Sequence, residues 1–450
     1  MQDIIMRIIV IIMILAGGYW IYRYKEKYKL FLDNKFWIFI SWGFAFILYF
    51  FLGIEYTKKL NIYSFGYIIL YWALFIGGQY AFLKYSKKKG QKLDEEEKKV
   101  DFSKKINLFP LFIVSLVCVI IYAIYILSIN NINIGSTRGI KTNGLATLLL
   151  IFSNSSLVIW LYELAYAIIN EKKMTIYGIL SAVIYNIPGV IISGRDALMI
   201  FLISTAIIFL YCGNYAKKVL KKECKIYKTI LKCAIAAFGA IMIYLIFLSN
   251  NRYGTDRSAV INMFKWSAKC QFPAYLEWIY YNCGGLGKLI LNVVFYYSSQ
   301  LSKFALIFEK YDGPYMCGLY QLHYVSRLLP ESWNMNFSIV TNKIYEITAN
   351  EGITGLKVFW ETAIGYSIYD FGRIGTLIMA FISGVIIEML NKYCNNKNNV
   401  ISIVTKTFIC TAIFLTIEVS PVFDYYYIFP VFWLVVLIFL DLKGAKIFGK

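Results

Sequence analysis

The sequence has few charged side chains for its length. Charged residues make up 16% of its 450 positions, whereas hydrophobic residues make up 59% and the mean hydropathy is +0.60. A water-soluble domain carries more polar surface than this, so the composition excludes a soluble globular protein. The net charge of +20 lies in short gaps between apolar runs. That pattern orients membrane spans and does not indicate a nucleic-acid partner, so we expect an all-α polytopic membrane protein.

The patterns of metal sites and disulfide frameworks are also missing. The nine cysteines are scattered without a C-x-x-C pair, and a single histidine leaves no Cys/His cluster for a metal ion. No Asp-x-Asp motif lies in any gap that we assign to the outer side. We therefore expect no metal or other cofactor. The first apolar run has no preceding basic segment and no small-residue cleavage site, so we expect it to be a retained span.

Eleven apolar runs are long enough to cross a membrane, which takes about 20 residues. They are residues 4–22, 35–54, 61–83, 107–129, 145–169, 174–192, 197–212, 231–248, 371–390, 400–418 and 424–442. The gaps between them alternate in charge, and one set carries 28 positive residues. By the positive-inside rule that set is cytoplasmic, which puts the N-terminus outside and the C-terminus inside the bacterial cytoplasmic membrane.

This reading divides the chain into three parts. An eight-span bundle covers residues 1–248 and contains a charged cytoplasmic linker at 84–105, a large outer loop covers 249–370, and three spans cover 371–450. Within the loop, the run 286–308 is long enough to cross, but Ser298, Ser299, Gln300 and Lys303 interrupt it. We favour an interfacial or re-entrant helix, because a full span would break the charge alternation downstream.

The outer loop is rich in aromatic side chains. They include Trp266, Tyr275, Trp278, Tyr280, Tyr281, Tyr315, Tyr320, Tyr324 and Trp333. Such rings fit the headgroup layer of a membrane, and they can also stack on the faces of sugars.

Arginines cluster at the predicted outer ends of the spans. Arg195 lies in a tight Ser-Gly-Arg-Asp hairpin, where it either snorkels to lipid headgroups or forks onto a phosphate or diphosphate of an anionic lipid-linked substrate. Arg252 and Arg257 follow the eighth span and either join Arg195 in one cluster or are surface residues, with Asp256 balancing Arg257.

Two further pairs are candidates for chemistry. His323, the only histidine, precedes Arg327 by four residues, so on a helix the two share a face. Neutral imidazole can act as a general base while the guanidinium holds a phosphate, although a lone histidine is also commonly a packed residue. Asp370 and Arg373 enter the ninth span, where Asp370 is expected to cap the helix N-terminus and to orient the arginine.

These stretches resemble the O-antigen and capsule repeat-unit polymerases. The resemblance is carried by Ser-Gly-Arg-Asp at 193–196, Tyr-Met-Cys-Gly-Leu-Tyr at 315–320, Arg-Leu-Leu-Pro at 327–330 and the stretch 362–375, within residues 185–390. It implies a metal-independent membrane glycosyltransferase that joins undecaprenyl-diphosphate-linked oligosaccharides at the outer face. It places Arg195, Arg327, Asp370 and Arg373 at family-like positions, and Arg252 and His323 match less closely. A flippase and a chain-length regulator of the same pathway are the partners it implies, besides membrane lipid.

The expected reaction needs cations at the leaving diphosphate and a base at the acceptor hydroxyl. Without a metal, guanidinium groups must meet the diphosphate charge. The candidate bases are His323, Asp370, Glu361 and Glu351, and His323 is preferred because an unperturbed imidazole has a pKa of about 6.5. Asp370 beside Arg373 would stay ionised and be the weaker base. The alternatives are a ligase of related layout, an outer-face acyltransferase, and a lipid-linked oligosaccharide flippase, against which the scarcity of mid-span charge argues.

Overall fold

The computed structural model describes most of the chain, and what it describes is almost entirely helical. It covers residues 2–24, 28–88, 105–130, 144–191, 196–218, 227, 257–326, 328, 338–352, 362–397 and 399–442. Within these ranges the two strands are each two residues long. The all-α class is therefore confirmed.

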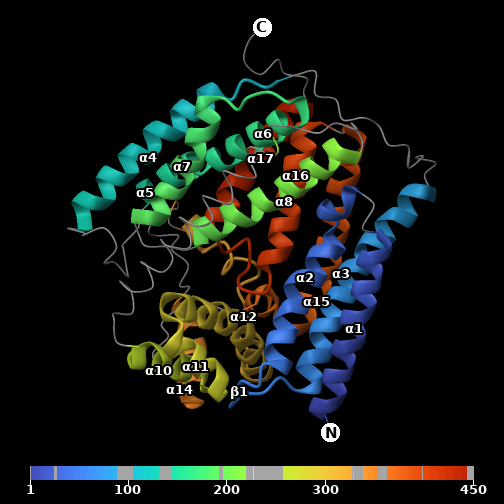
Figure 1. The fold of residues 1–450 in the computed structure, drawn as a ribbon, viewed down its shortest axis with the longest axis vertical. Helices are drawn as coiled ribbons and strands as arrows, with labels where there is room; N and C mark the ends of the chain where they lie inside the picture. The colour runs from blue at the N-terminus through green and yellow to red at the C-terminus, as the bar shows by residue number, and fades with distance from the viewer. Residues whose placement is uncertain are drawn as a thin grey trace.

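The helices fall into three groups along the chain (Figure 1). The N-terminal group is α1 (Gln2–Tyr24), the 3-10 helix η1 (Tyr28–Leu32), α2 (Asn34–Phe51), α3 (Ile62–Lys88), α4 (Phe109–Asn130), α5 (Gly144–Ser153), α6 (Ser155–Asn170), α7 (Ile176–Ile191) and α8 (Asp196–Lys218). The middle group is α10 (Arg257–Ala268), α11 (Ala274–Asn282), α12 (Gly284–Lys310), α13 (His323–Ser326) and α14 (Ser338–Asn350). The C-terminal group is α15 (Ala363–Lys397), α16 (Val400–Leu415) and α17 (Tyr425–Leu442).

Ten of the eleven predicted spans coincide with apolar helices, and the run 231–248 lies outside the described residues. By length and composition seven helical segments of the described chain can cross a membrane, with α5 and α6 counted as one, and α7, α16 and α17 are shorter apolar helices. A membrane protein follows directly from this. The span 145–169 is divided at Asn154, where three serines bond back to carbonyls three residues earlier, which bends helices.

Two gaps expected on one side, of which the long loop was placed there by the parity of its flanking spans, also meet in space. Strand β1 (Glu55–Tyr56), which follows α2, pairs antiparallel with β2 (Cys270–Gln271) of the long loop. We call this end the loop face. At the opposite end Lys392 of α15 donates to Ser86 of α3 at 3.1 Å, and we call this end the lysine face. Helix α1 begins at the loop face and α17 ends at the opposite one (Figure 1). Which face contacts the cytoplasm stays a prediction.

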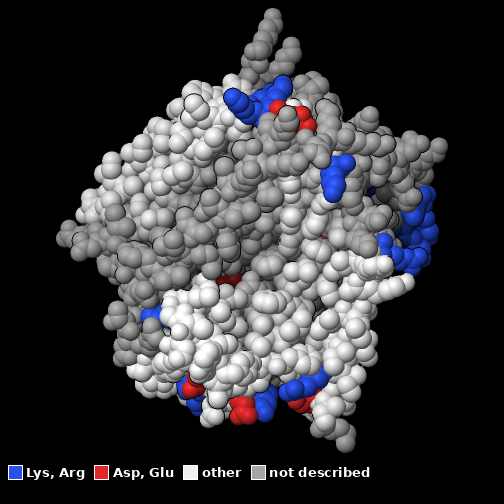
Figure 2. Space-filling model, in the orientation of Figure 1, with Lys and Arg blue, Asp and Glu red and all other residues white. Residues whose placement is uncertain are grey.

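The charge distribution fits a molecule held across a bilayer. Figure 2 shows Lys, Arg, Asp and Glu mostly near the ends of the molecule, with a largely uncharged band between them. Apolar side chains of α1 are highly exposed in this band, such as Ile12 at 59% and Leu15 at 67%. Exposed apolar side chains in such numbers are favourable against lipid and unfavourable in water.

The ambiguous run 286–308 forms one unbroken helix that stays with the loop-face elements. Near the start of α12, Gly287 lies against the backbone of Ile279 in α11, and near its end Glu309 pairs with Lys58 next to β1. Both ends therefore belong to the loop face, which favours the non-crossing interpretation. The helix packs between α2, α11 and α15, and its polar centre, including Gln300, is fully buried, so it does not lie on a surface of the described bundle. Whether it is interfacial or re-entrant stays a prediction.

Helices α3 and α15 pack closely because each presents a glycine to the backbone of the other. A Cβ added at Gly78 would lie 2.2 Å from the carbonyl oxygen of Phe381, and one at Gly384 would lie 2.0 Å from that of Phe75. The backbones can approach this closely only with small residues. Helix α15 begins at Ala363, eight residues before the predicted boundary, so its first turns belong to the segment that we had assigned to the loop.

Candidate functional site

Three segments that are distant in sequence meet beneath the loop face: 315–326, 363–371 and 416–424. The backbone N–H of Cys317 donates to the Asp370 carbonyl at 2.8 Å, and that of Ala363 donates to the Thr416 carbonyl at 2.7 Å. Thr416 also accepts from the indole of Trp42, near the middle of α2, at 3.0 Å. The third segment therefore reaches well inside the bundle. We call this junction the loop-face site.

Asp370 is a fully buried carboxylate that holds the first segment in place. Its two oxygens accept the backbone N–H groups of Tyr320 at 2.9 Å and Gln321 at 3.2 Å. Its printed hydrogen bonds go to this loop segment and not to the turn of α15 that follows, so they do not form the cap that the sequence led us to expect. Asp370 instead precedes a kink at Gly372, whose φ of +66° is a conformation that favours glycine.

His323 belongs to the segment that Asp370 holds and lies two residues after Gln321. It is the first residue of α13, and its ring packs on that of Phe423 with centroids 4.3 Å apart. The side-chain carbonyl of Gln321 accepts a hydrogen bond from the hydroxyl of Ser420 in the third segment. The histidine is half-buried. Its backbone begins α13, and its ring packs on one neighbouring aromatic ring.

An aromatic cluster surrounds this histidine. Phe423 lies 4.7 Å from Tyr366 and 5.7 Å from Tyr320 between ring centroids, and Tyr320 lies 5.4 Å from Tyr369. The aromatic residues expected in the loop thus fall into two groups: Tyr320 belongs to the site, whereas Trp266 is 70% exposed on α10. Exposed indoles of this kind fit a headgroup layer.

Asp424 is an acidic residue of the site that sequence reasoning did not select. It ends the third segment and accepts the N–H of Tyr426 at 2.8 Å, as a cap of α17. Asp424 is buried, and the carboxylates of Asp196 and Glu418 lie close enough to interact with it electrostatically. Only its position just before an apolar run could have pointed to it, and that signal indicates a helix cap.

Arg373 does not contact Asp370 in the way the sequence led us to expect. Its Nε donates to the carbonyl of Phe308 at 2.7 Å, and its Nη2 donates to that of Glu309 at 3.3 Å. The guanidinium also lies 5.4 Å above the Phe308 ring. The two carbonyls end α12, where a cation is favourable. Arg373 therefore joins α15 to the loop-face helices, and diphosphate binding by it stays a prediction.

The other predicted cations are not described as side chains. Arg195, Arg252 and Arg327 lie outside the described residues, and Arg257 begins α10 but its side chain is not described. Arg195 directly precedes Asp196 in the sequence, whose charge reaches Asp424. Arg327 directly follows α13. Two of the predicted cations are thus sequence neighbours of residues at the site.

Of the two remaining candidate bases, Glu351 and Glu361, the structure describes only Glu351. Glu351 follows α14 and pairs with Lys310 at 3.8 Å, away from the hydrogen bonds that join the three segments. Glu361 lies outside the described residues. His323 is therefore the candidate base that the described structure places within the aromatic cluster.

No three His, Cys, Asp or Glu side chains in the described ranges are grouped so as to hold a metal ion. No family model, curated protein or solved structure matches this chain. The function must therefore be argued from the site.

Proposed function

We propose that this chain polymerises lipid-diphosphate-linked oligosaccharides by glycosyl transfer at the loop face. The observation that carries the proposal is the position of His323, which lies among aromatic rings on a segment anchored by the buried Asp370. An imidazole can accept a proton near neutral pH, and aromatic faces bind sugar rings.

The proposed step moves one sugar chain between two lipid carriers. The acceptor hydroxyl attacks the anomeric carbon of the donor, the bond from that carbon to the diphosphate oxygen breaks, and the hydroxyl proton passes to His323. The leaving diphosphate keeps the bonding electrons, and arginines stabilise its charge, with Arg195 and Arg327 as the expected pair. Asp370 acts in this scheme as a positioning residue.

Cells that lack the protein separate this proposal from its nearest rival. A polymerase defect should leave single lipid-linked repeat units at the outer face, whereas a flippase defect should leave them at the inner face. Accumulation at the inner face would overturn the proposal. Loss of attachment to a lipid core or a protein, with polymer still made, would indicate a ligase instead.

Purified protein tests the base. General-base assistance is typically worth about 10² to 10⁴ in rate, so His323→Ala should slow turnover by about that range. His323→Gln keeps a hydrogen-bonding side chain without a comparable base and should be nearly as slow. Tyr345→Phe, at an exposed position on α14, is the control and should be unaffected. Rates within a few-fold of wild type for both His323 variants would remove the histidine from the chemistry.

A further inference from the structure

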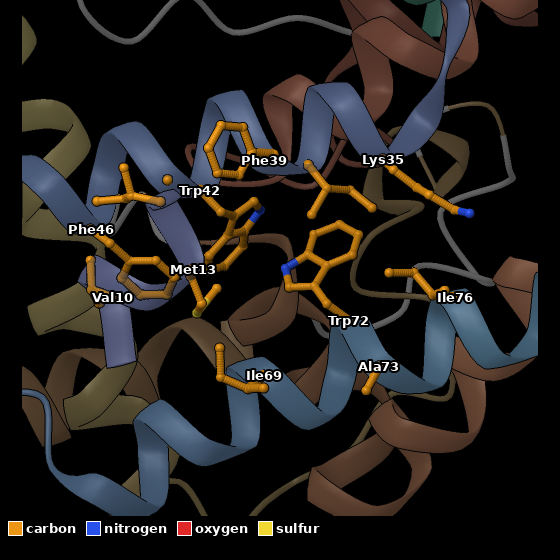
Figure 3. Close-up of a pocket in the computed structure, with 13 residues that line it drawn as sticks. Val10, Met13, Lys35, Phe39, Trp42, Phe46, Ile69, Trp72, Ala73 and Ile76 are labelled. Atoms are coloured by element: carbon orange, nitrogen blue, oxygen red, sulfur yellow. The ribbon is translucent and has the colours of Figure 1, made fainter. Parts of the chain in front are cut away.

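A cavity of about 340 Å³ lies between α1, α2 and α3 (Figure 3). Its walls are aliphatic and aromatic, and the indoles of Trp42 and Trp72 meet edge-on at 5.7 Å between centroids. The volume is within the range of ligand pockets, about 300 to 1,000 Å³. Helix α1 forms one wall, and the rest of that helix is largely exposed. The cavity is therefore placed to receive an apolar chain from a bilayer.

Lys35 is the one charged residue of this lining, and it lies at one end. Figure 3 shows its amine pointing away from the apolar side chains. Lys35 lies in the first turn of α2, toward the lysine face, and its Nζ is 3.2 Å from the hydroxyl of Tyr80. Among the described residues it has no ion pair within 4 Å, since no such pair with Asp33 or Glu388 is formed.

The positive excess among the described charges at this end comes from α3. Asp33 and Glu388 both interact electrostatically with Lys35 and Lys406, so the two negative and two positive charges cancel. The last turns of α3 add exposed lysines, among them Lys87. A basic end joined to an apolar cavity is complementary to a lipid that has an anionic headgroup.

We propose that this cavity binds one acyl chain of an anionic phospholipid from the leaflet at the lysine face, with the lipid phosphate on Lys35 and Tyr80. The amine and the phenol would lie at headgroup depth while the chain runs along Trp42 and Trp72. The polyprenyl chain of a lipid-diphosphate donor is a poorer occupant, because the proposed function puts its diphosphate at the loop-face site and not at Lys35. Only this comparison of occupants rests on the proposed function.

Native mass spectrometry of the full-length protein in detergent tests the site with phosphatidylglycerol and phosphatidylcholine as probes. Wild type should retain one phosphatidylglycerol more tightly than phosphatidylcholine. A lysine near the membrane surface is worth about 1 kcal/mol toward an anionic lipid, so Lys35→Gln should reduce that preference about fivefold. Lys173→Gln, at an exposed position between α6 and α7 that is outside both the lining and α3, should leave it unchanged.

The substitution Gly43→Leu is designed to fill the cavity without crowding the backbone. A Cβ at Gly43 would meet only the Phe39 ring at 3.9 Å, and leucine is a better helix former than glycine. This variant should lose the bound lipid, whereas Gly66→Leu, where an added Cβ meets nothing within 4 Å, should keep it. Equal lipid retention by the two leucine variants would overturn the proposal, as would an unchanged headgroup preference in Lys35→Gln. Preferential capture of a polyprenyl phosphate would overturn the choice of occupant.

Discussion

Replacing Asp370 separates a positioning role from a catalytic one. Its carboxylate is fully buried and accepts two backbone N–H groups, from Tyr320 at 2.9 Å and Gln321 at 3.2 Å. Asp370→Ala leaves both donors without that acceptor. Asp370→Asn keeps one carbonyl oxygen but turns an NH₂ group toward the second donor. The two variants therefore remove two bonds and one bond from the segment that carries His323.

The expected size of each effect follows from the cost of an unsatisfied buried donor, about 1 to 3 kcal/mol. Asn should destabilise the segment by about 1 to 3 kcal/mol and Ala by about 2 to 6 kcal/mol. With tenfold for each 1.4 kcal/mol, local opening should rise about 5- to 150-fold for Asn and about 30- to 10⁴-fold for Ala. Opening of this kind is local, since the bundle around it keeps its own apolar packing.

Hydrogen exchange measured by mass spectrometry on peptides covering 318–326 reports this opening directly. Turnover should fall in step with it, because an open segment no longer holds His323 against Phe423. Asp441→Asn, on the lysine face near Lys397, is the control and should change neither quantity. If Asp370→Asn lost turnover by about 10² to 10⁴ while exchange at 318–326 stayed at the wild-type rate, Asp370 would be a catalytic base and its positioning role would be refuted.

The spans and their relative sides could be read from the sequence because the membrane imposes a length and a charge rule on every crossing helix. Each apolar run had to satisfy its own backbone hydrogen bonds, so ten of them appear as helices at the expected places. The β1–β2 pairing then joins two gaps that the alternation of spans had put on one side. The polar centre of 286–308, read as a reason against crossing, is instead buried between helices.

The contacts within the site could not be read in the same way. Asp370 bonds to backbone groups about 50 residues away, and a backbone N–H has no sequence signature. Arg373 likewise bonds to backbone carbonyls at the end of α12, although its spacing suggested a partner three residues earlier. Local spacing predicts pairs on one helix face, but the kink at Gly372 lies between these two residues and disrupts that geometry. Asp424 was missed because its local pattern is that of a cap.

The packing of α3 against α15, the membrane topology and the different roles expected of Arg195 and Arg373 each lead to a further testable expectation. Gly384→Leu should yield aggregated protein on size exclusion, because the new Cβ would lie 2.0 Å from an α3 carbonyl oxygen. In single-cysteine proteins, the exposed Cys317 should react with an impermeant maleimide on intact cells, and reaction only after lysis would contradict the topology. Burial raises the pKa of the Cys270 thiol to about 12, so at pH 8 only roughly 10⁻⁴ of it is thiolate and it should stay unlabelled. Arg195→Lys should lose most polymer at normal membrane abundance, because lysine cannot fork onto a diphosphate. Arg373→Lys should instead lower the melting temperature with an unchanged KM, since hydrogen bonds from a charged donor to the carbonyls that end α12 are worth about 1.5 to 3 kcal/mol each. The opposite result would be full polymer from Arg195→Lys and a raised KM with normal stability in Arg373→Lys. It would mean that Arg373, at the end of α12, binds the diphosphate and that Arg195 does not.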